Sequence, residues 1–324
     1  MLSALLRATN FQSPLLRTLV PTVGAAFAIQ GAFAIPSIIA QSERFYDLSG
    51  SLTYLSCTAL SLALPVLRAR AATASTLPWP SITASLLGKP LAQGGWWDWR
   101  QLALSAAVSV WATRLGTHLF SRITSDNGTD SRFDKIRTSP PSFLVAFFAQ
   151  ATWVSLNLLP IIALNALPPN TFAKLPLLTP FSVLGVALWI SGFALEVAAD
   201  AQKSKWVAEK KAKKHSEDFL TRGLWGKSRH PNYAGEIALW SGVAIAAASV
   251  LASGVGQAAL GWTGVGGRLG ACLLAGASPA FTTFLLTKVS GIPLSEKKYD
   301  GKYGKRKDYQ EWKKNTPMLI PKIW

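Results

Sequence analysis

The chain has 324 residues, 49% of them hydrophobic, and a net charge of +17 although only 15% are charged; its mean hydropathy is +0.25. A soluble domain carries about 25% charged residues, so this composition excludes an ordinary soluble domain and indicates a membrane protein. Most of the excess charge lies in residues 199–231 and 288–324, where it is typical of loops beside anionic lipid, and we expect no nucleic acid partner.

Apolar runs long enough to cross a membrane recur along the chain, since a spanning helix takes about 20 mostly apolar residues. The sequence therefore predicts an all-α fold, a polytopic transmembrane helical bundle with about seven spans. Residues 1–290 would form the membrane domain and 291–324 a basic cytosolic tail. The expected spans cover residues 18–40, 47–67, 101–120, 142–166, 177–198, 232–252 and 269–290.

Charge decides the orientation, because cytosolic loops carry the excess of lysine and arginine. We expect the N-terminus outside and the C-terminus in the cytosol. The endoplasmic reticulum is the expected membrane. A mitochondrial membrane is the alternative, because the first residues carry Arg7 and Arg17 and no acid before Glu43, which is typical of a transit peptide.

Polar residues open the second expected span. Tyr46 and Asp47 follow Glu43 and Arg44, and Tyr54 lies eight residues after Tyr46, on roughly the same helix face. Tyrosines are common at membrane interfaces, so interfacial anchoring is the leading interpretation here. A catalytic role is the other.

The fifth expected span carries Glu196, Asp200 and Lys203, spaced i, i+4 and i+7 on one helix face. Carboxylates inside a span are costly and are functional candidates by default. An ion pair between Asp200 and Lys203 at the end of the helix is the alternative.

The densest polar motif is SRHPNYAGE at residues 228–236. Proline suits the first turn of a helix, so the sixth span is expected to begin at Pro231. Arg229 and His230 would then lie at a helix N-terminus, which favours a phosphate, and Asn232 and Glu236 one turn apart suit a hydrogen-bonding group. A cap of the helix at the membrane interface is the alternative interpretation.

The tail places aromatic residues at 299, 303, 309 and 312 among cations, a pattern suited to the membrane surface or to folding over a cofactor. The chain has no Gly-rich nucleotide fingerprint and no metal-ligand spacing, so no metal is expected.

SRHPNYAGEIALW, the upstream EVAADAQK and the tail KYGKRKDYQEWKKNTPMLIPKIW together resemble the steroid 5-alpha-reductase-like superfamily. More narrowly, they are similar to its branch of uncharacterised membrane proteins. The resemblance is strongest over residues 180–324. It implies a membrane-embedded, NADPH-dependent reductase of a carbon–carbon double bond in a lipid or steroid-like substrate, an oxidoreductase of lipid metabolism.

The resemblance also assigns residues. Asn232 and Glu236 match an N-x-x-G-E element that contacts the cofactor. The implied cofactor-binding residues are Asp200, Lys203, Arg229, His230, Asn232, Tyr233, Glu236, Asp308 and Tyr309. Candidates for the catalytic acid are Tyr46, Asp47, Tyr54 and Glu196, because a hydrogen-bond donor at the substrate carbonyl would stabilise the enolate and supply a proton.

Two other functions share this pattern. Isoprenylcysteine and phospholipid methyltransferases carry an RHP-Y element and use S-adenosylmethionine; the N-x-x-G-E unit favours the reductase. A non-catalytic lipid-binding protein that has kept the fold is the third possibility, because fold does not guarantee activity.

Overall fold

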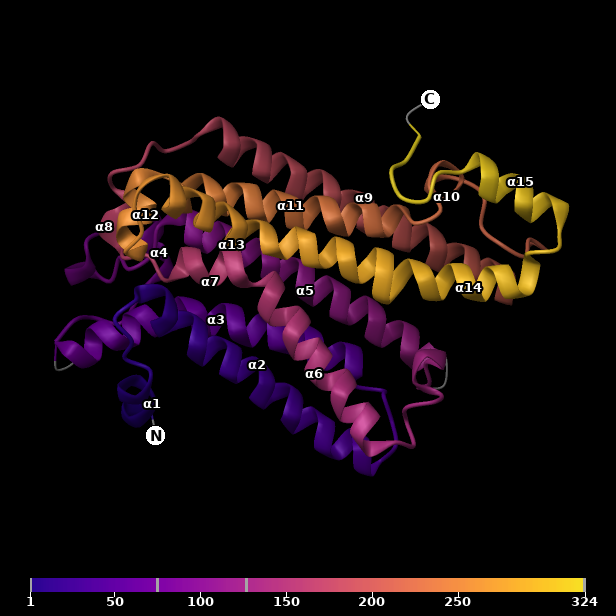
Figure 1. Ribbon diagram of the computed structural model, residues 1–324, viewed down its shortest axis with the longest axis horizontal. Helices are drawn as coiled ribbons and strands as arrows, with labels where there is room; N and C mark the ends of the chain where they lie inside the picture. The colour runs from indigo at the N-terminus through magenta and orange to yellow at the C-terminus, as the bar shows by residue number, and fades with distance from the viewer. Residues whose placement is uncertain (1, 74–75, 126–127, 323–324) are drawn as a thin grey trace. The chain divides into compact units, whose positions relative to one another are not determined.

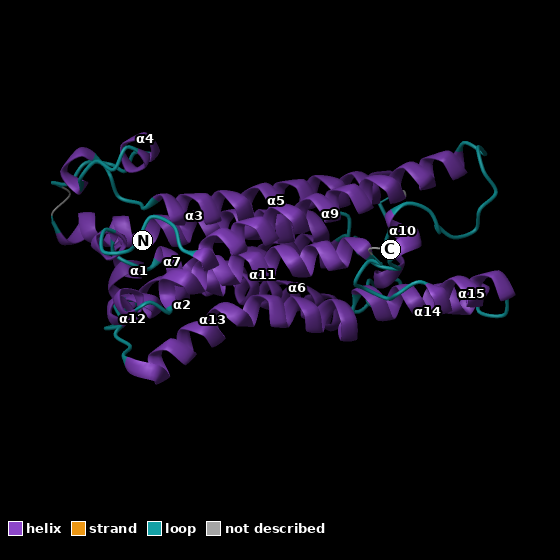
Figure 2. Cartoon of the chain, turned by 90° about the horizontal axis from the view of Figure 1, so that it is seen from above, coloured by secondary structure: helices purple, strands orange, loops and turns teal. Residues whose placement is uncertain are grey.

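The computed structural model describes residues 2–73, 76–125 and 128–322, and every regular element in them is a helix (Figure 1; Figure 2). A helix pairs its backbone polar groups internally, which a membrane requires of a spanning segment. The predicted all-α class is confirmed.

The number of spans differs from the prediction. Five helices in the described residues are long and apolar enough to cross a membrane, or six if a bent pair counts as one span. The bent pair covers the predicted span 142–166. Its two helices meet at an angle of 52°, next to Pro160, whose ring removes a helical hydrogen bond and favours a kink.

The predicted span 101–120 does form a helix, α5 (Trp99–Ser125), but it is not among the helices apolar enough to cross. Polar residues such as Arg114 and His118 interrupt its apolar run. This helix accounts for the difference between the predicted seven spans and the observed six at most.

The chain divides into two compact units, Met1–Thr179 with Ala247–Ala277, and Pro180–Ala246 with Ser278–Trp324. The first unit contains α1 (Leu2–Ala8), α2 (Pro14–Ile39), α3 (Tyr46–Ala72), α4 (Ile82–Leu86), α5, α6 (Pro140–Asn157), α7 (Leu159–Asn165), α8 (Pro169–Phe172), α12 (Gly254–Leu260) and the first part of α13 (Gly264–Phe284). The second contains α9 (Pro180–Lys211), α10 (Leu224–Lys227), most of α11 (Pro231–Leu251), the end of α13, the π-helical turn η3 (Leu285–Val289), α14 (Gly291–Tyr303) and α15 (Lys307–Asn315).

Buried amides hold α2, α3 and α6 together in the first unit. Gln150 Nε2 donates to the Ser49 hydroxyl at 3.0 Å and to Gln30 Oε1 at 3.2 Å, while Gln30 Nε2 donates to Thr53 Oγ1 at 2.8 Å. In an apolar interior such bonds specify one arrangement, because an unpaired amide would be costly.

A buried ion pair ties the start of α3 to the segment before α6. Glu43 is 1% exposed and accepts Arg137 Nε at 2.8 Å, Arg137 Nη2 at 2.6 Å and the Asp130 amide at 2.6 Å. Burial raises the pKa of Glu43, but these hydrogen bonds outweigh it and hold the pKa below its usual value.

In the second unit α9 and α11 run side by side with their backbones in contact (Figure 1). A Cβ at Gly192 would lie 2.5 Å from the Leu239 amide, and a Cβ at Gly235 would lie 2.6 Å from the Glu196 amide. Gly185 and Gly242 repeat the pattern seven residues away. Small residues allow such an approach between membrane helices, and here they place Glu196 beside the first turns of α11.

The predicted span 269–290 continues past its expected end. The helix passes through η3 into α14, so it runs from Gly264 to Tyr303. Much of the predicted basic tail is therefore helical and belongs to the second unit.

Glu43→Gln is expected to lower the free energy of unfolding by about 2–3 kcal/mol at neutral pH, because it removes the buried negative charge that pairs with Arg137. Since folding lowers the pKa of Glu43, its stabilisation is present above the ordinary glutamate pKa of about 4.3 and is lost as pH falls through the lowered value. The difference in the free energy of unfolding between Glu43→Gln and wild type should therefore decrease over the same pH range. Thermal unfolding in detergent at several pH values measures this.

Asp134→Asn is the matched control, because Asp134 also contacts Arg137, at 3.4 Å, but its side chain is 62% exposed. It should change stability by less than about 0.5 kcal/mol. Equal losses in the two variants would contradict a special role for the buried pair.

Candidate functional site

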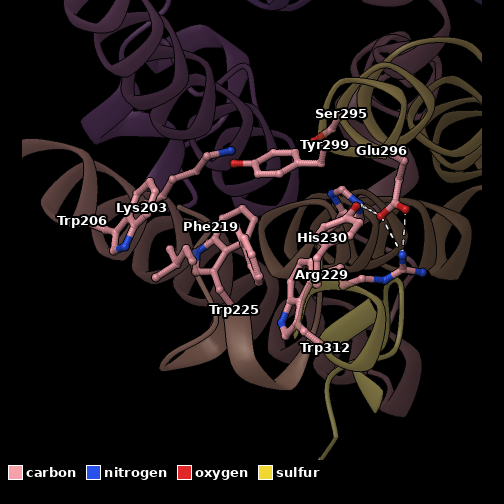
Figure 3. Close-up of a pocket in the computed structure, with 12 residues that line it drawn as sticks. Lys203, Trp206, Phe219, Trp225, Arg229, His230, Ser295, Glu296, Tyr299 and Trp312 are labelled. Atoms are coloured by element: carbon pink, nitrogen blue, oxygen red, sulfur yellow. Dashed lines mark hydrogen bonds and ion pairs between the residues drawn. The ribbon is translucent and has the colours of Figure 1, made fainter. Parts of the chain in front are cut away.

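A pocket in the second unit lies among the C-terminal part of α9, residues 219–230, α14 and α15 (Figure 3). Its cavity volume is about 30 Å³, below the roughly 300–1,000 Å³ typical of small-molecule sites, and the pocket is partly open to its surroundings. Half of its lining residues are aromatic, namely Trp206, Phe219, Trp225, Tyr299, Tyr309 and Trp312.

Phe219 gathers the aromatic residues of the tail. Its ring centroid lies 5.5 Å from that of Tyr303, 5.3 Å from that of Tyr309 and 5.4 Å from that of Trp312. Tyr299 and Tyr303 are four residues apart on α14, and Tyr309 and Trp312 are three apart on α15, so each pair lies on one face of its helix. The tail thus folds back onto residues 217–231.

Charges converge on the carboxylate of Glu296. Arg229 Nη1 lies 2.9 and 2.7 Å from its two oxygens, His230 Nε2 lies 3.0 Å from Oε1, and Lys313 Nζ lies 2.8 Å from Oε2. Lys313 also pairs with Asp300 at 2.6 Å. Figure 3 shows Arg229 and His230 both directed at Glu296.

His230 is 5% exposed. Burial lowers its pKa, and the opposing effect of Glu296 does not restore it, so the ring favours the neutral form near pH 7. Because a carboxylate only accepts, Nε2 carries the proton and Nδ1 is left as the acceptor. The ring stacks on Tyr233, with centroids 5.6 Å apart and planes 9° apart.

Residues after α15 form hydrogen bonds with the segment that precedes α11. The Arg229 amide donates to the Pro317 carbonyl at 2.9 Å, Ser228 Oγ donates to the Leu319 carbonyl at 2.7 Å, and the Lys322 amide donates to the Lys227 carbonyl at 3.0 Å. Residues 317–322 therefore run beside residues 227–229.

The structure confirms that α11 begins at Pro231. Asn232 and Glu236 lie half-buried in its first turns and are not among the residues that line the pocket. Asn232 Oδ1 is buried and has no hydrogen-bond partner among the described residues. An unpaired buried acceptor is uncommon and costs free energy.

On α9, Glu196 and Asp200 are 3% and 8% exposed, and Lys203 lines the pocket. The Lys203 ammonium lies 4.8 Å from the centre of the Trp225 ring, and it points toward the Tyr299 hydroxyl in Figure 3. Trp225 is held by a bond from its Nε1 to the Ala199 carbonyl at 2.9 Å.

Of the two predicted cofactor residues Asp308 and Tyr309, only Tyr309 lines the pocket. Tyr309 is buried, lines the pocket and donates its hydroxyl to Asp300 at 2.9 Å. Asp308 is exposed and pairs with Arg306 at 2.7 Å. Of the nine predicted cofactor residues, the pocket lining contains Lys203, Arg229, His230 and Tyr309.

Three of the four predicted catalytic residues belong to the first unit. Tyr46 donates its hydroxyl to the Ala146 carbonyl at 2.9 Å, and Asp47 pairs with Arg132 at 3.0 Å. Tyr54 is 1% exposed and its ring meets those of Trp111 and Trp153 at right angles. Glu196 alone shares the second unit with the pocket.

Sequence reasoning missed Glu296 and Lys313. The aromatic and cationic alternation of the tail was the available signal for Lys313, but a single acid among lysines gave no reason to select Glu296. No group of three or more His, Cys, Asp or Glu side chains with metal-binding geometry occurs in the described part of the chain.

No curated protein and no solved structure matches the chain. A family model described as "Protein of unknown function (DUF1295)" matches residues 75–316, about three quarters of the chain. That range includes the whole of α9, α10 and α11, and the pocket residues as well. The chain belongs to this DUF1295 family of uncharacterised membrane proteins.

Proposed function

We propose that the chain is a membrane-embedded, NADPH-dependent reductase of a carbon–carbon double bond in a lipid-like substrate. The observation that supports this most is the pocket of the second unit, which combines flat aromatic walls with Arg229, Lys203 and the neighbouring Lys313. Aromatic faces suit adenine and nicotinamide rings, and fixed cations suit phosphates.

The residues present fit such a cofactor. Arg229 Nε and Trp312 Nε1 are buried donors, and Asn232 Oδ1 is a buried acceptor; none has a hydrogen-bond partner among residues 2–73, 76–125 and 128–322. A dinucleotide offers both phosphate oxygens and amide N–H groups. Arg229 and Lys203 would hold its phosphates, and Asn232 or His230 Nδ1 would accept from its carboxamide.

When bound, NADPH supplies a hydride. The task of the chain is then to exclude water and to hold a proton near the developing enolate. Glu196 is the strongest of the four candidates for that proton, because it is buried in the same unit as the pocket and lies on the face of α9 next to α11. For Tyr46, a role as donor would require release of its bond to the Ala146 carbonyl.

The resemblance of residues 228–236 and of the tail to the steroid 5-alpha-reductase-like superfamily supports the same reaction, and five or six apolar helices provide access to a lipid substrate. The proposal includes an endoplasmic reticulum membrane with the pocket and its basic tail in the cytosol, where NADPH is supplied. A mitochondrial membrane is the alternative.

One observation favours a second function. Glu296 places a carboxylate among aromatic rings, and that combination also suits the ribose hydroxyls and the sulfonium of S-adenosylmethionine. A methyltransferase is therefore the rival enzyme. The three cationic or donor groups around Glu296 weigh against it, because they already neutralise the carboxylate.

Detergent-purified protein is expected to bind NADPH saturably, and Asn232→Ala should weaken binding about tenfold or more by removing a buried acceptor. Isothermal titration measures both, with Asn315→Ala, a change at an exposed site on α15, as the matched control. Binding of S-adenosylmethionine without NADPH would replace the reductase by a methyltransferase. Binding of neither would make a non-catalytic lipid-binding protein the better account.

Arg229→Ala should weaken NADPH by about tenfold or more but NADH by only a few-fold if the guanidinium meets the 2′-phosphate, since charge-assisted hydrogen bonds are worth about 1.5–3 kcal/mol. Arg222→Ala is the control, because Arg222 is 53% exposed, pairs with Glu209 and does not line the pocket. Equal losses for NADPH and NADH would place Arg229 away from the 2′-phosphate.

A further inference from the structure

Among the described residues, Glu296 is the one acid that lines the pocket, and it occupies the donors that a ligand phosphate would need. Its carboxylate accepts from Arg229, His230 and Lys313 at 2.7–3.0 Å, and its side chain is 19% exposed. Phosphate and carboxylate oxygens favour the same geometry with these groups. Two anions cannot both keep all of these contacts.

The cluster also has unused capacity. Arg229 Nε and Trp312 Nε1 are buried, line the same pocket and have no hydrogen-bond partner in the described residues. Leaving a buried donor unpaired costs about 1–3 kcal/mol. Glu296 therefore satisfies only part of the Arg229 guanidinium, and the remaining donors favour a ligand with several acceptor oxygens.

A cationic ligand fits this place less well. Several of the nearby rings already face a cation of the chain. Lys203 lies 4.8 Å from the centre of Trp225, Arg306 lies 5.6 Å from that of Phe219, and Lys313 lies 6.0 Å from that of Tyr309. An incoming ammonium group would meet both these charges and Arg229.

We propose that Glu296 is an internal competitor for a phosphate group of the ligand, with both anions sharing Arg229, His230 and Lys313. Binding of the ligand releases Glu296 from part of these pairs, so Glu296 sets the affinity and disfavours weakly bound anions. This inference rests on the proposed nucleotide pocket and adds the residue that tunes it. It implies that removing the charge of Glu296 strengthens anion binding, whereas a residue that only positions the cations would weaken binding when changed.

The first experiment titrates detergent-purified full-length protein with inorganic pyrophosphate and with NADPH, comparing wild type with Glu296→Gln. Glu296→Gln should bind both ligands about tenfold more tightly, because one nearby negative charge is removed. Glu311→Gln is the matched control: it removes the same charge from an exposed site on α15 and should change affinity less than about twofold. Unchanged or weaker binding by Glu296→Gln would overturn the proposal.

Glu296→Asp guards against a folding defect, because it keeps the charge and shortens the side chain. Partial loss of its contacts should raise the affinity by an intermediate amount, and affinity at or below the wild-type value would count against competition. Absence of pyrophosphate binding in every variant would also overturn the shared site. Pyrophosphate binding without NADPH binding would instead refute the proposed cofactor and leave the competition intact.

The same phosphate chemistry occurs in soluble nucleotides and in lipid headgroups. Nanodiscs of phosphatidylcholine with and without phosphatidic acid separate these sources. Phosphatidic acid can compete with pyrophosphate only in the membrane that contains it. If it lowers the pyrophosphate affinity of wild type, and lowers the pyrophosphate affinity of Arg229→Ala by a smaller factor, the competing phosphate belongs to a lipid. Equal affinity in the two membranes assigns it to a soluble ligand.

Discussion

The half-buried carboxylate of Glu296 brings together three parts of the chain that are far apart in sequence. It joins α14 to Arg229 and His230 before α11 and to Lys313 on α15. The rings around Phe219 pack beside this cluster, and residues 317–322 pair with residues 227–229. Because a carboxylate without these partners would be costly to keep in such a pocket, the arrangement of the tail depends on this cluster.

Much of the fold could be predicted from the sequence, because lipid imposes long apolar helices and six of the seven expected spans overlap with the helices or the bent pair that can cross. The errors arose in three helical segments. The span 142–166 was predicted as one straight helix from its hydropathy, but it bends next to Pro160. Helix α5 is long enough to cross a membrane, but its polar residues make it less apolar than a spanning helix. The sequence also did not predict that the last long helix continues to Tyr303, because residues 291–303 are too polar to extend an apolar run.

The candidate site was predictable only in part. Arg229 and His230 stood out because they precede a proline-started helix. Lys203 was selected by its spacing from two acids on the same span and by resemblance, and Tyr309 by resemblance; the pocket contains all four. Glu296 could not be selected, since its role depends on partners 17 to 67 residues away that only the tertiary fold brings together. Local sequence also could not show that the polar atoms of Tyr46 and Asp47 are held by Ala146 and Arg132 in the first unit.

The pocket of the second unit is proposed here to hold a dinucleotide. The most direct test is an electron cryo-microscopy map of the purified protein with saturating NADPH. We expect density for the dinucleotide against the aromatic walls, with a phosphate at Arg229 and the Glu296 carboxylate displaced from it. A map that shows NADPH elsewhere, or an unchanged Arg229–Glu296 pair with no density beside it, would contradict the account.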